Sequence, residues 1–227
     1  MVELLSRDFE DHHRYREAQN PIATTWLISF RQINDHDQLA ADYLKFMCFL
    51  SEKAIPRSLL PQVSALEAED AIGTLKAYAY ITEREKSDTY DIHRLVRLAM
   101  LNWLKKQGEL EAWAAKVIRR LNDVFPLPEH DNREIWAAYL PHAQHVLESP
   151  GAEDDVKFTL FSKVGRSFQI LGQYREAEIM HTRALDGQEK MLGPDHPDTL
   201  HSVSNLGNTF CIQGQYEKAE ELHRRAL

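Results

Sequence analysis

Histidines are the side chains of this sequence best suited to acid–base or metal chemistry, and the chain has 11 of them. His142, His145 and Glu148 follow one another at helical spacing, so they could line one face of a helix. A zinc site there would need a further ligand from elsewhere in the chain. Solvated helix residues are therefore the favoured interpretation. The adjacent pair His12 and His13 would point apart on a helix and cannot share a metal ion.

Other patterns of catalytic chemistry are missing from the sequence. There is no Gly-x-x-x-x-Gly-Lys-Ser/Thr loop to cradle the phosphates of a nucleotide. Neither a nucleophile elbow nor a cysteine with a supporting histidine context is evident. Carboxylates are plentiful, but they lie on charged faces such as Glu217 to Glu221, where solvation is the default. We therefore expect no enzymatic activity, no cofactor, no metal, and no binding or hydrolysis of ATP.

Composition narrows the functional classes further. The chain has 27 Lys and Arg against 35 Asp and Glu, and it lacks the basic cluster that nucleic acids attract. Cys48 and Cys211 stand far apart and are expected to be buried thiols, with a disulfide as the poorer alternative. The sequence has no apolar run of about 18 residues that could span a membrane. Its N-terminus is charged where a signal peptide would be apolar. We expect a cytoplasmic protein that binds neither nucleic acid nor membranes.

The elements that would position any site begin with an internal repeat. Residues 171–185, LGQYREAEIMHTRAL, recur as QGQYEKAEELHRRAL at residues 213–227. The period is 42 residues, since Gly172 matches Gly214. A fixed period in this range indicates stacked helical units.

Each copy of the repeat has the pattern of a helix, a turn and a second helix. Phe161, Val164 and Phe168 fall at helical intervals, and Gly165 leaves room for the second helix to approach closely. Gly172 with Gln173 is expected to end the first helix and turn the chain. The facing stripe of the second helix consists of Ala177, Met180, Ala184 and Leu185. In the second copy Gly207 corresponds to Gly165 and Gly214 to Gly172. His181 recurs as His223, and both are expected to pack inside their hairpins rather than act as bases.

These residues resemble the tetratricopeptide repeat, and the long period resembles its kinesin-light-chain variety. That variety joins its repeats with a loop like LGPDHPDTL at residues 192–200, which Pro194 and Pro197 are expected to keep out of a helix. About three such hairpins are normally needed for stability, because each buries its apolar face against a neighbour. Two copies that end at Leu227 therefore suggest a truncated array in a fragment of a longer protein.

Residues 1–107 follow a different pattern. Core helices are expected at residues 42–50, just after Pro56, at residues 67–78 and at residues 93–106. Two short strands are expected at residues 78–84 and 87–93, around a polar turn. The last helix is expected to bury Leu95, Val96, Ala99 and Trp103. Three helices, a hairpin and another helix form a winged-helix layout.

DNA binding does not follow from that layout. The candidate recognition helix carries Glu67, Glu69 and Asp70 against Lys76, so it would repel phosphates.

Several short sequence segments of this region resemble another family more closely than they resemble DNA-binding winged helices. NPIATTWLISF, AIP at residues 54–56, LLP, AIGTLKAY and IHRLV resemble the winged-helix portion of fungal NB-ARC proteins, which are signalling ATPases with C-terminal tetratricopeptide arrays. The resemblance runs from about Leu4 to Leu147 and continues into the repeats. In that family a Met-His-Asp motif opens the last helix, and its His contacts the nucleotide phosphate. The matching residues here are Ile92, His93 and Arg94, so the His is kept and the acid is not.

The resemblance implies a nucleotide contact for His93 only within a longer parent protein. For this chain alone, His93 is expected to be a partly buried histidine at the end of a strand.

Residues 108–150 are expected to form a helical bridge of two helices. The first has Trp113, Val117, Leu121 and Val124 on one face, and the second has Ile135, Tyr139 and Val146. Pro141 is expected to kink or split the second helix. The segment SPGAEDD, residues 149–155, is expected to be a flexible joint.

The predicted fold class is therefore mainly α. A winged-helix-like unit with a small hairpin (residues 1–107) is followed by the helical bridge (108–150) and two tetratricopeptide hairpins of an α-solenoid (151–227). The predicted function is that of a non-catalytic protein-interaction and regulatory region of a fungal NB-ARC signalling ATPase. The alternative is a stand-alone adaptor similar to kinesin light chain that binds a peptide cargo.

The resemblance implies that a protein or peptide ligand binds on the concave face of the repeats. The side of the first helix opposite the buried stripe carries Lys163 and Arg166 in the first copy, and Asn205 and Asn208 at the matching places in the second. Asn suits a peptide backbone because it offers a donor and an acceptor, while Lys and Arg suit a carboxylate. The alternative is that all four are merely solvated. Lys163→Glu together with Asn205→Ala is expected to abolish partner capture without lowering the melting temperature. The sequence leaves the oligomeric state open.

Overall fold

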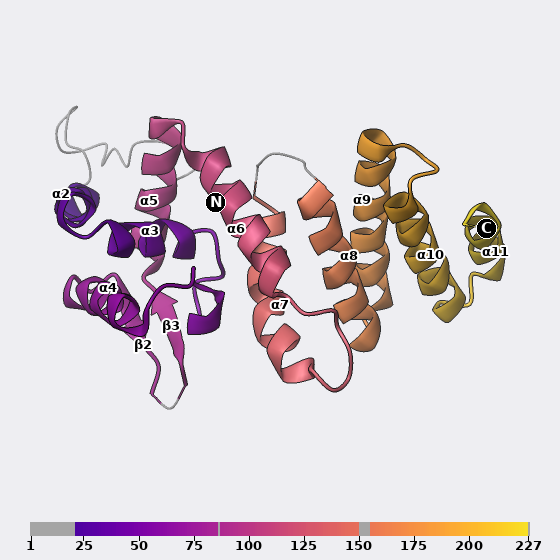
Figure 1. Ribbon diagram of the computed structural model, residues 1–227, viewed down its shortest axis with the longest axis horizontal. Helices are drawn as coiled ribbons and strands as arrows, with labels where there is room; N and C mark the ends of the chain where they lie inside the picture. The colour runs from indigo at the N-terminus through magenta and orange to yellow at the C-terminus, as the bar shows by residue number, and fades with distance from the viewer. Residues whose placement is uncertain (1–20, 86, 150–154, 227) are drawn as a thin grey trace, which may run out of the picture. The chain divides into compact units, whose positions relative to one another are not determined.

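The computed structural model describes residues 21–85, 87–149 and 155–226. They belong to two compact units, Met1–Trp113 and Ala114–Leu227. Helices dominate both units, so the predicted mainly α fold with one small sheet and repeat-type hairpins is confirmed (Figure 1). The predicted domain boundaries at residues 107 and 150 stay predictions. The His12–His13 pair and all of the predicted joint except its two ends lie outside the described residues.

The first unit has the helices expected from the sequence and, before them, helix α2, which was not predicted from the sequence. They are α2 (Pro21–His36), α3 (Gln38–Met47), the short 3-10 turn η1 (Arg57–Leu59), α4 (Ala65–Ala77) and α5 (Arg94–Gln107). Asp37 caps α3 by accepting the Ala40 amide at 2.9 Å, and its other oxygen accepts the Thr74 hydroxyl of α4 at 2.7 Å. Gly108 ends α5 in the left-handed conformation, with φ of 73°.

The sheet of the first unit has one strand more than the sequence suggested. The predicted hairpin is present as β2 (Ile81–Glu83) and β3 (Thr89–Ile92), and β1 (Ile55–Pro56) pairs antiparallel with the free side of β3. A strand of two residues that contains proline gives no alternating pattern, and proline fits only at an edge. Asp91 of β3 helps to hold β1 in place, because its carboxylate accepts the Ala54 amide at 2.8 Å.

The core of the first unit lies between α2, α3, α4, α5 and the sheet. Val96 of α5 is buried as predicted, but Leu95 is exposed, so its predicted burial is wrong. Met100 and Leu104 continue the buried stripe instead. Because α5 begins only at Arg94, its first turn projects Leu95 away from the core.

Lys45 is a buried cation within this core. Its ammonium group lies 5.9 Å from the ring centres of Phe30 and Trp103 and 5.4 Å from that of Trp113, and 3.5 Å from Asp42. Aromatic faces attract cations, so burial of this charge is compensated. Through this contact Trp113, at the start of the helix that follows α5, lies against Lys45 of α3.

Successive helix pairs make up the second unit. They are α6 (Leu110–Val124), α7 (Arg133–Leu147), α8 (Asp155–Ile170), α9 (Tyr174–Leu192), α10 (Pro197–Ile212) and α11 (Tyr216–Arg225). Each helix from α7 onward packs against the next, and α10 also contacts α8. Figure 1 shows this succession from α7 to the end of α11. The last hairpin has an apolar core of Leu185, Val203, Leu206, Phe210 and Ala219.

Helix α7 departs from the sequence expectations in three ways. It runs unbroken through Pro141, so the predicted alternative of a split helix is wrong. Ile135 is exposed, and the neighbouring Trp136 is fully buried in its place. His142 is only 1% exposed, so its interpretation as a solvated residue is wrong too. Tyr139 and Val146 are buried as predicted. At the start of the helix Trp136 takes the buried position, and its Nε1 donates to the Glu129 carbonyl at 2.8 Å.

The turns within the repeats match the predictions, whereas the loop between them is shorter. Gly172 and Gly214 adopt φ of 74° and 76°, which glycine tolerates best. Only residues 193–196 connect α9 to α10, because Pro197 begins α10 instead of lying in the loop. Proline is favoured at the first position of a helix, where its missing N–H costs nothing.

The predicted close approach at Gly165 is present. A Cβ atom at this position would lie 2.6 Å from Cε1 of the His181 ring. His181 is 0% exposed, so it fills the hairpin packing as predicted. At the matching place in the second copy, a Cβ on Gly207 would lie 2.9 Å from Cε1 of His223.

Candidate peptide-binding site

Lys163 of α8 forms hydrogen bonds with backbone carbonyls of the same chain. Its ammonium group donates to the carbonyl of Asn122 at 2.6 Å and to that of Phe125 at 3.0 Å. These carbonyls lie at the C-terminal end of α6, where helix carbonyls lack intrahelical partners. Burial lowers the pKa of Lys163, and the nearby Asp123 opposes that change. Lys163 therefore caps the preceding helix.

Arg166 makes a similar contact one turn further along α8. Its Nε donates to the carbonyl of Pro128 at 2.9 Å, although the side chain as a whole is exposed. The two cations thus attach α8 to the segment that leaves α6. The chain's own carbonyls thus engage the ammonium group of Lys163 and the Nε of Arg166, and the prediction that these two cations bind a ligand carboxylate stays a prediction.

Replacing Lys163 by Met should lower the free energy of unfolding by about 1 kcal/mol. Two hydrogen bonds from a charged donor are lost, but the site is half-exposed and water can replace part of them. Urea denaturation followed by circular dichroism measures the change. The earlier expectation, an unchanged stability, is the outcome that would contradict this role for Lys163.

Asn205 and Asn208 lie at the matching places on α10 and are arranged differently. Asn208 is exposed and Asn205 is half-buried. The backbone carbonyl of Asn205 accepts the Thr209 hydroxyl at 2.9 Å. Among the described residues, neither side-chain amide has a hydrogen-bond partner. These two amides are therefore available to a ligand.

The same face of α10 continues into Ile212, which is exposed. Cys211 is exposed too, but it lies on the side of α10 toward α11. The prediction of a buried thiol is wrong for Cys211, whose sulfur lies 3.8 Å from Nε2 of His223. Cys48 is buried as predicted, and burial raises the pKa of its thiol. The face of α10 that carries Asn205 and Asn208 thus combines two amides and the apolar side chain of Ile212.

Gln169 of α8 joins the two first helices of the repeats. Its amide nitrogen donates to the Thr209 hydroxyl at 2.7 Å and to the Asn205 carbonyl at 3.4 Å. The contact fixes α10 beside α8, so the two asparagines have a defined position relative to the first repeat. Sequence reasoning missed this role, because the second copy has Cys211 where the first has Gln169.

His93 opens α5 as its N-cap. Its Nδ1 accepts the Leu95 amide at 3.2 Å, and its ring centre lies 5.3 Å from that of Trp26. The side chain is exposed, so the prediction of a partly buried histidine is wrong. An N-cap projects from the end of its helix, which leaves the rest of the imidazole ring accessible.

Metal-binding and membrane-spanning features are absent from the described residues. Among the described residues, no group of three His, Cys, Asp or Glu side chains is placed to hold a metal ion. No helix within the described ranges is both long and apolar enough to cross a bilayer.

Comparison with known proteins agrees with this architecture. Residues 157–227 match the tetratricopeptide repeat family, which confirms the predicted repeats. The chain is also 47% identical over 207 residues to a nucleotide-binding leucine-rich repeat (NLR)-like protein of Hyaloscypha variabilis. The match covers 90% of this chain and 21% of that relative, so the chain spans about a fifth of the relative's length. The predicted resemblance to part of a larger protein of this kind is confirmed.

Proposed function

We propose that this chain is a non-catalytic, protein-binding and regulatory region of a cytoplasmic NLR-type signalling ATPase. The tetratricopeptide repeats support the interaction role, because such hairpins are interaction modules. The relative's name supports the wider setting, since it describes a nucleotide-binding protein. In this proposal the first unit is a winged-helix module, and His93 meets a nucleotide phosphate only when a phosphate-binding loop is supplied by another part of the protein.

The ligand of the repeats is proposed to be an extended peptide on the exposed face of α10. The observation that carries this proposal is the pair of unoccupied amides on Asn205 and Asn208. An asparagine amide can donate to one carbonyl and accept one N–H, which matches the alternating groups of an extended backbone. Lys163 and Arg166 support this surface by holding α8 against the segment that leaves α6.

Replacing both Asn205 and Asn208 by Ala should weaken peptide binding by about thirtyfold. Each amide contributes hydrogen bonds of about 1 kcal/mol, and about 1.4 kcal/mol corresponds to a factor of ten. Peptides selected from a random phage library on residues 1–227 provide the ligand, and fluorescence anisotropy gives the dissociation constants. The melting temperature should hardly change, because exposed substitutions alter stability by about 0.5 kcal/mol or less.

Asn102→Ala, at an exposed position on α5, is the matched control and should bind every selected peptide as well as the unmodified chain does. If the double variant binds every selected peptide as tightly as the unmodified chain does, the peptide does not bind on this face of α10.

The alternative, a stand-alone adaptor similar to kinesin light chain, shares the repeat surface and differs in the first unit. A transcript that continues upstream into a phosphate-binding loop favours the ATPase setting. Translation that starts at Met1 favours the adaptor.

A further inference from the structure

The tip of the hairpin between β2 and β3 is an exposed feature of the first unit that the repeats do not use. Arg84 follows β2, and its N–H donates to the carbonyl of Thr89 in β3 at 3.0 Å. The Ser87 N–H donates to the Arg84 carbonyl at 3.4 Å. A hydrogen bond across three positions of this kind holds the two Cα atoms within about 7 Å of each other. Every described residue from Thr82 to Asp88 is exposed.

The sequence at this tip has the pattern that basophilic protein kinases select. These enzymes recognise an Arg three positions before the Ser or Thr that they modify, because carboxylates in their substrate groove bind the guanidinium group. Among the 227 residues, Arg84 and Ser87 are the one pair with this spacing. The Ser87 hydroxyl lies 2.8 Å from the Thr89 hydroxyl, and its side chain is exposed, so a kinase can reach it.

Arg84 has a carboxylate partner that does not depend on it alone. Its Nε donates to Asp91 at 2.8 Å and one of its terminal nitrogens donates at 3.3 Å. Asp91 accepts two further hydrogen bonds, from the Ala54 N–H at 2.8 Å and from the Lys53 ammonium group at 3.0 Å. The Arg84 side chain is 44% exposed, and exposed ion pairs contribute little to stability. Arg84 can therefore leave Asp91 while that carboxylate keeps two donors.

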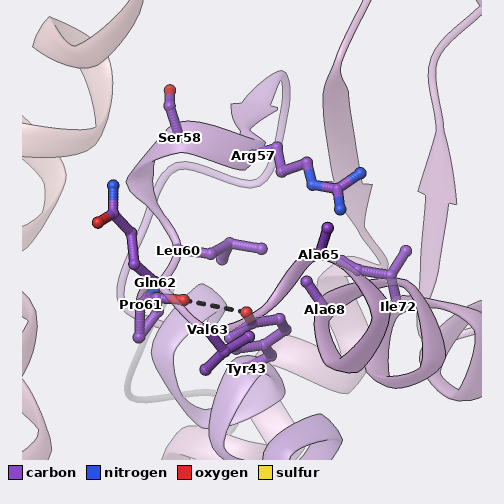
Figure 2. A pocket seen from close by; sticks show the side chains of 10 residues that line it. All are labelled: Tyr43, Arg57, Ser58, Leu60, Pro61, Gln62, Val63, Ala65, Ala68 and Ile72. Atoms are coloured by element: carbon purple, nitrogen blue, oxygen red, sulfur yellow. Dashed lines mark hydrogen bonds between the residues drawn. The ribbon is translucent and has the colours of Figure 1, made fainter.

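The neighbouring charges favour Arg84 as the partner of a phosphate at this serine. Arg57 lies beside the tip, because its backbone N–H donates to the Asp88 carbonyl at 3.0 Å. Figure 2 shows Arg57 at one side of a pocket of about 250 Å³, with its guanidinium directed toward α4, where it forms an ion pair with Glu69. Glu85 and Asp88 precede and follow the serine and repel a phosphate.

We propose that Ser87 is phosphorylated by a basophilic protein kinase and that Arg84 then leaves Asp91 to bind the phosphate. In this reaction the Ser87 oxygen bonds to the γ-phosphorus of ATP, the bond from that phosphorus to ADP breaks, and the hydroxyl proton passes to the catalytic base of the kinase. The phosphate adds about 1.5 to 2 negative charges at pH 7 and three acceptor oxygens. The modification thus regulates the charge of the first unit and is independent of the repeat surface.

The site is tested by incubating residues 1–227 with ATP and a panel of purified basophilic kinases. The chain should take up one phosphate, and fragmentation mass spectrometry should place it on Ser87. Ser87→Ala should abolish the uptake. Arg84→Ala should slow it at least about tenfold, because the kinase loses a charged hydrogen-bond donor. Thr89→Ala is the matched control, since it removes a neighbouring hydroxyl without changing the pattern, and its rate should stay within about twofold.

The movement of Arg84 is tested by proton–nitrogen NMR of arginine side chains. Phosphorylation should shift the Nε–H signal of Arg84, and the shifted signal should titrate with the phosphate near pH 6, since the second pKa of a phosphoserine is about 6. The Nε–H signal of Arg57 should stay in place. No uptake by any kinase of the panel, uptake at another residue, or equal rates for Arg84→Ala would overturn the assignment of the site. An unshifted Arg84 signal at full phosphorylation would overturn its release from Asp91.

Discussion

Replacing Gly187 by Ala should destabilise the repeat region by about 2 kcal/mol, although Ala is the better helix former. A Cβ atom at Gly187 of α9 would lie 2.0 Å from Cε1 of the buried Phe158 ring, so the ring or the helix has to move. Overpacking of this kind costs about 3 kcal/mol, and the change from Gly to Ala within a helix returns about 1 kcal/mol. Thermal and urea unfolding measure the difference.

The other helical glycines provide matched controls for this prediction. The contact distances rank Gly187 first, Gly165 second and Gly207 third, and the destabilisation by Ala should follow that order. A Cβ at Gly73 of α4 meets nothing within 4 Å, so Gly73→Ala should stabilise the chain by up to about 1 kcal/mol. The double variant Gly187→Ala with Phe158→Leu should recover part of the loss. Equal effects at Gly187 and Gly73 would show that helix propensity alone decides the result.

Acidification should destabilise the chain through His181. Burial, together with the nearby His201, lowers the pKa of His181 from 6.5 to about 4. Among the described residues, neither ring nitrogen of His181 has a hydrogen-bond partner. The folded state therefore resists protonation, while the unfolded state takes up the proton as the pH falls through 6.5.

The sign of the effect follows from that difference in proton uptake. Above pH 6.5 the side chain is neutral in both states and adds no pH dependence. Between pH 6.5 and about 4 the stability should fall progressively, by about 3 kcal/mol at the lower end. Urea midpoints measured across this range give the curve.

His181→Leu should remove most of this slope, because an apolar side chain has no proton to bind. His223→Leu is the matched control, since His223 occupies the same place in the second copy but is only half-buried. It should leave the slope due to His181 in place. An unchanged pH dependence in His181→Leu would assign the slope to other groups.

Much of this fold follows from local patterns in the sequence. Helical periodicity, turn glycines such as Gly172 and the 42-residue repeat predicted both hairpins, because these signals depend on neighbouring residues along one chain. The hairpin of β2 and β3 was predicted for the same reason. The absence of a phosphate-binding loop motif was likewise evident from the sequence alone.

Tertiary packing decided what the local pattern left undetermined. Ile135 and Trp136 are adjacent apolar residues on one helix, and only the Glu129 carbonyl and the surrounding core determine that Trp136 is the buried one. His142 and His145 look alike in the sequence, yet packing buries the first almost completely.

The candidate peptide-binding site shows most clearly which properties follow from the sequence and which depend on tertiary contacts. The repeat placed Lys163 and Asn205 at equivalent positions, because register is a property of the sequence. Whether each side chain is free depends on which carbonyls lie opposite, and those belong to residues about 40 positions away. Lys163 meets the carbonyls of Asn122 and Phe125, while the amide of Asn205 meets no group among the described residues. The sequence by itself thus determined the helices and their register, and the long-range contacts decided which side chains remain available to a partner.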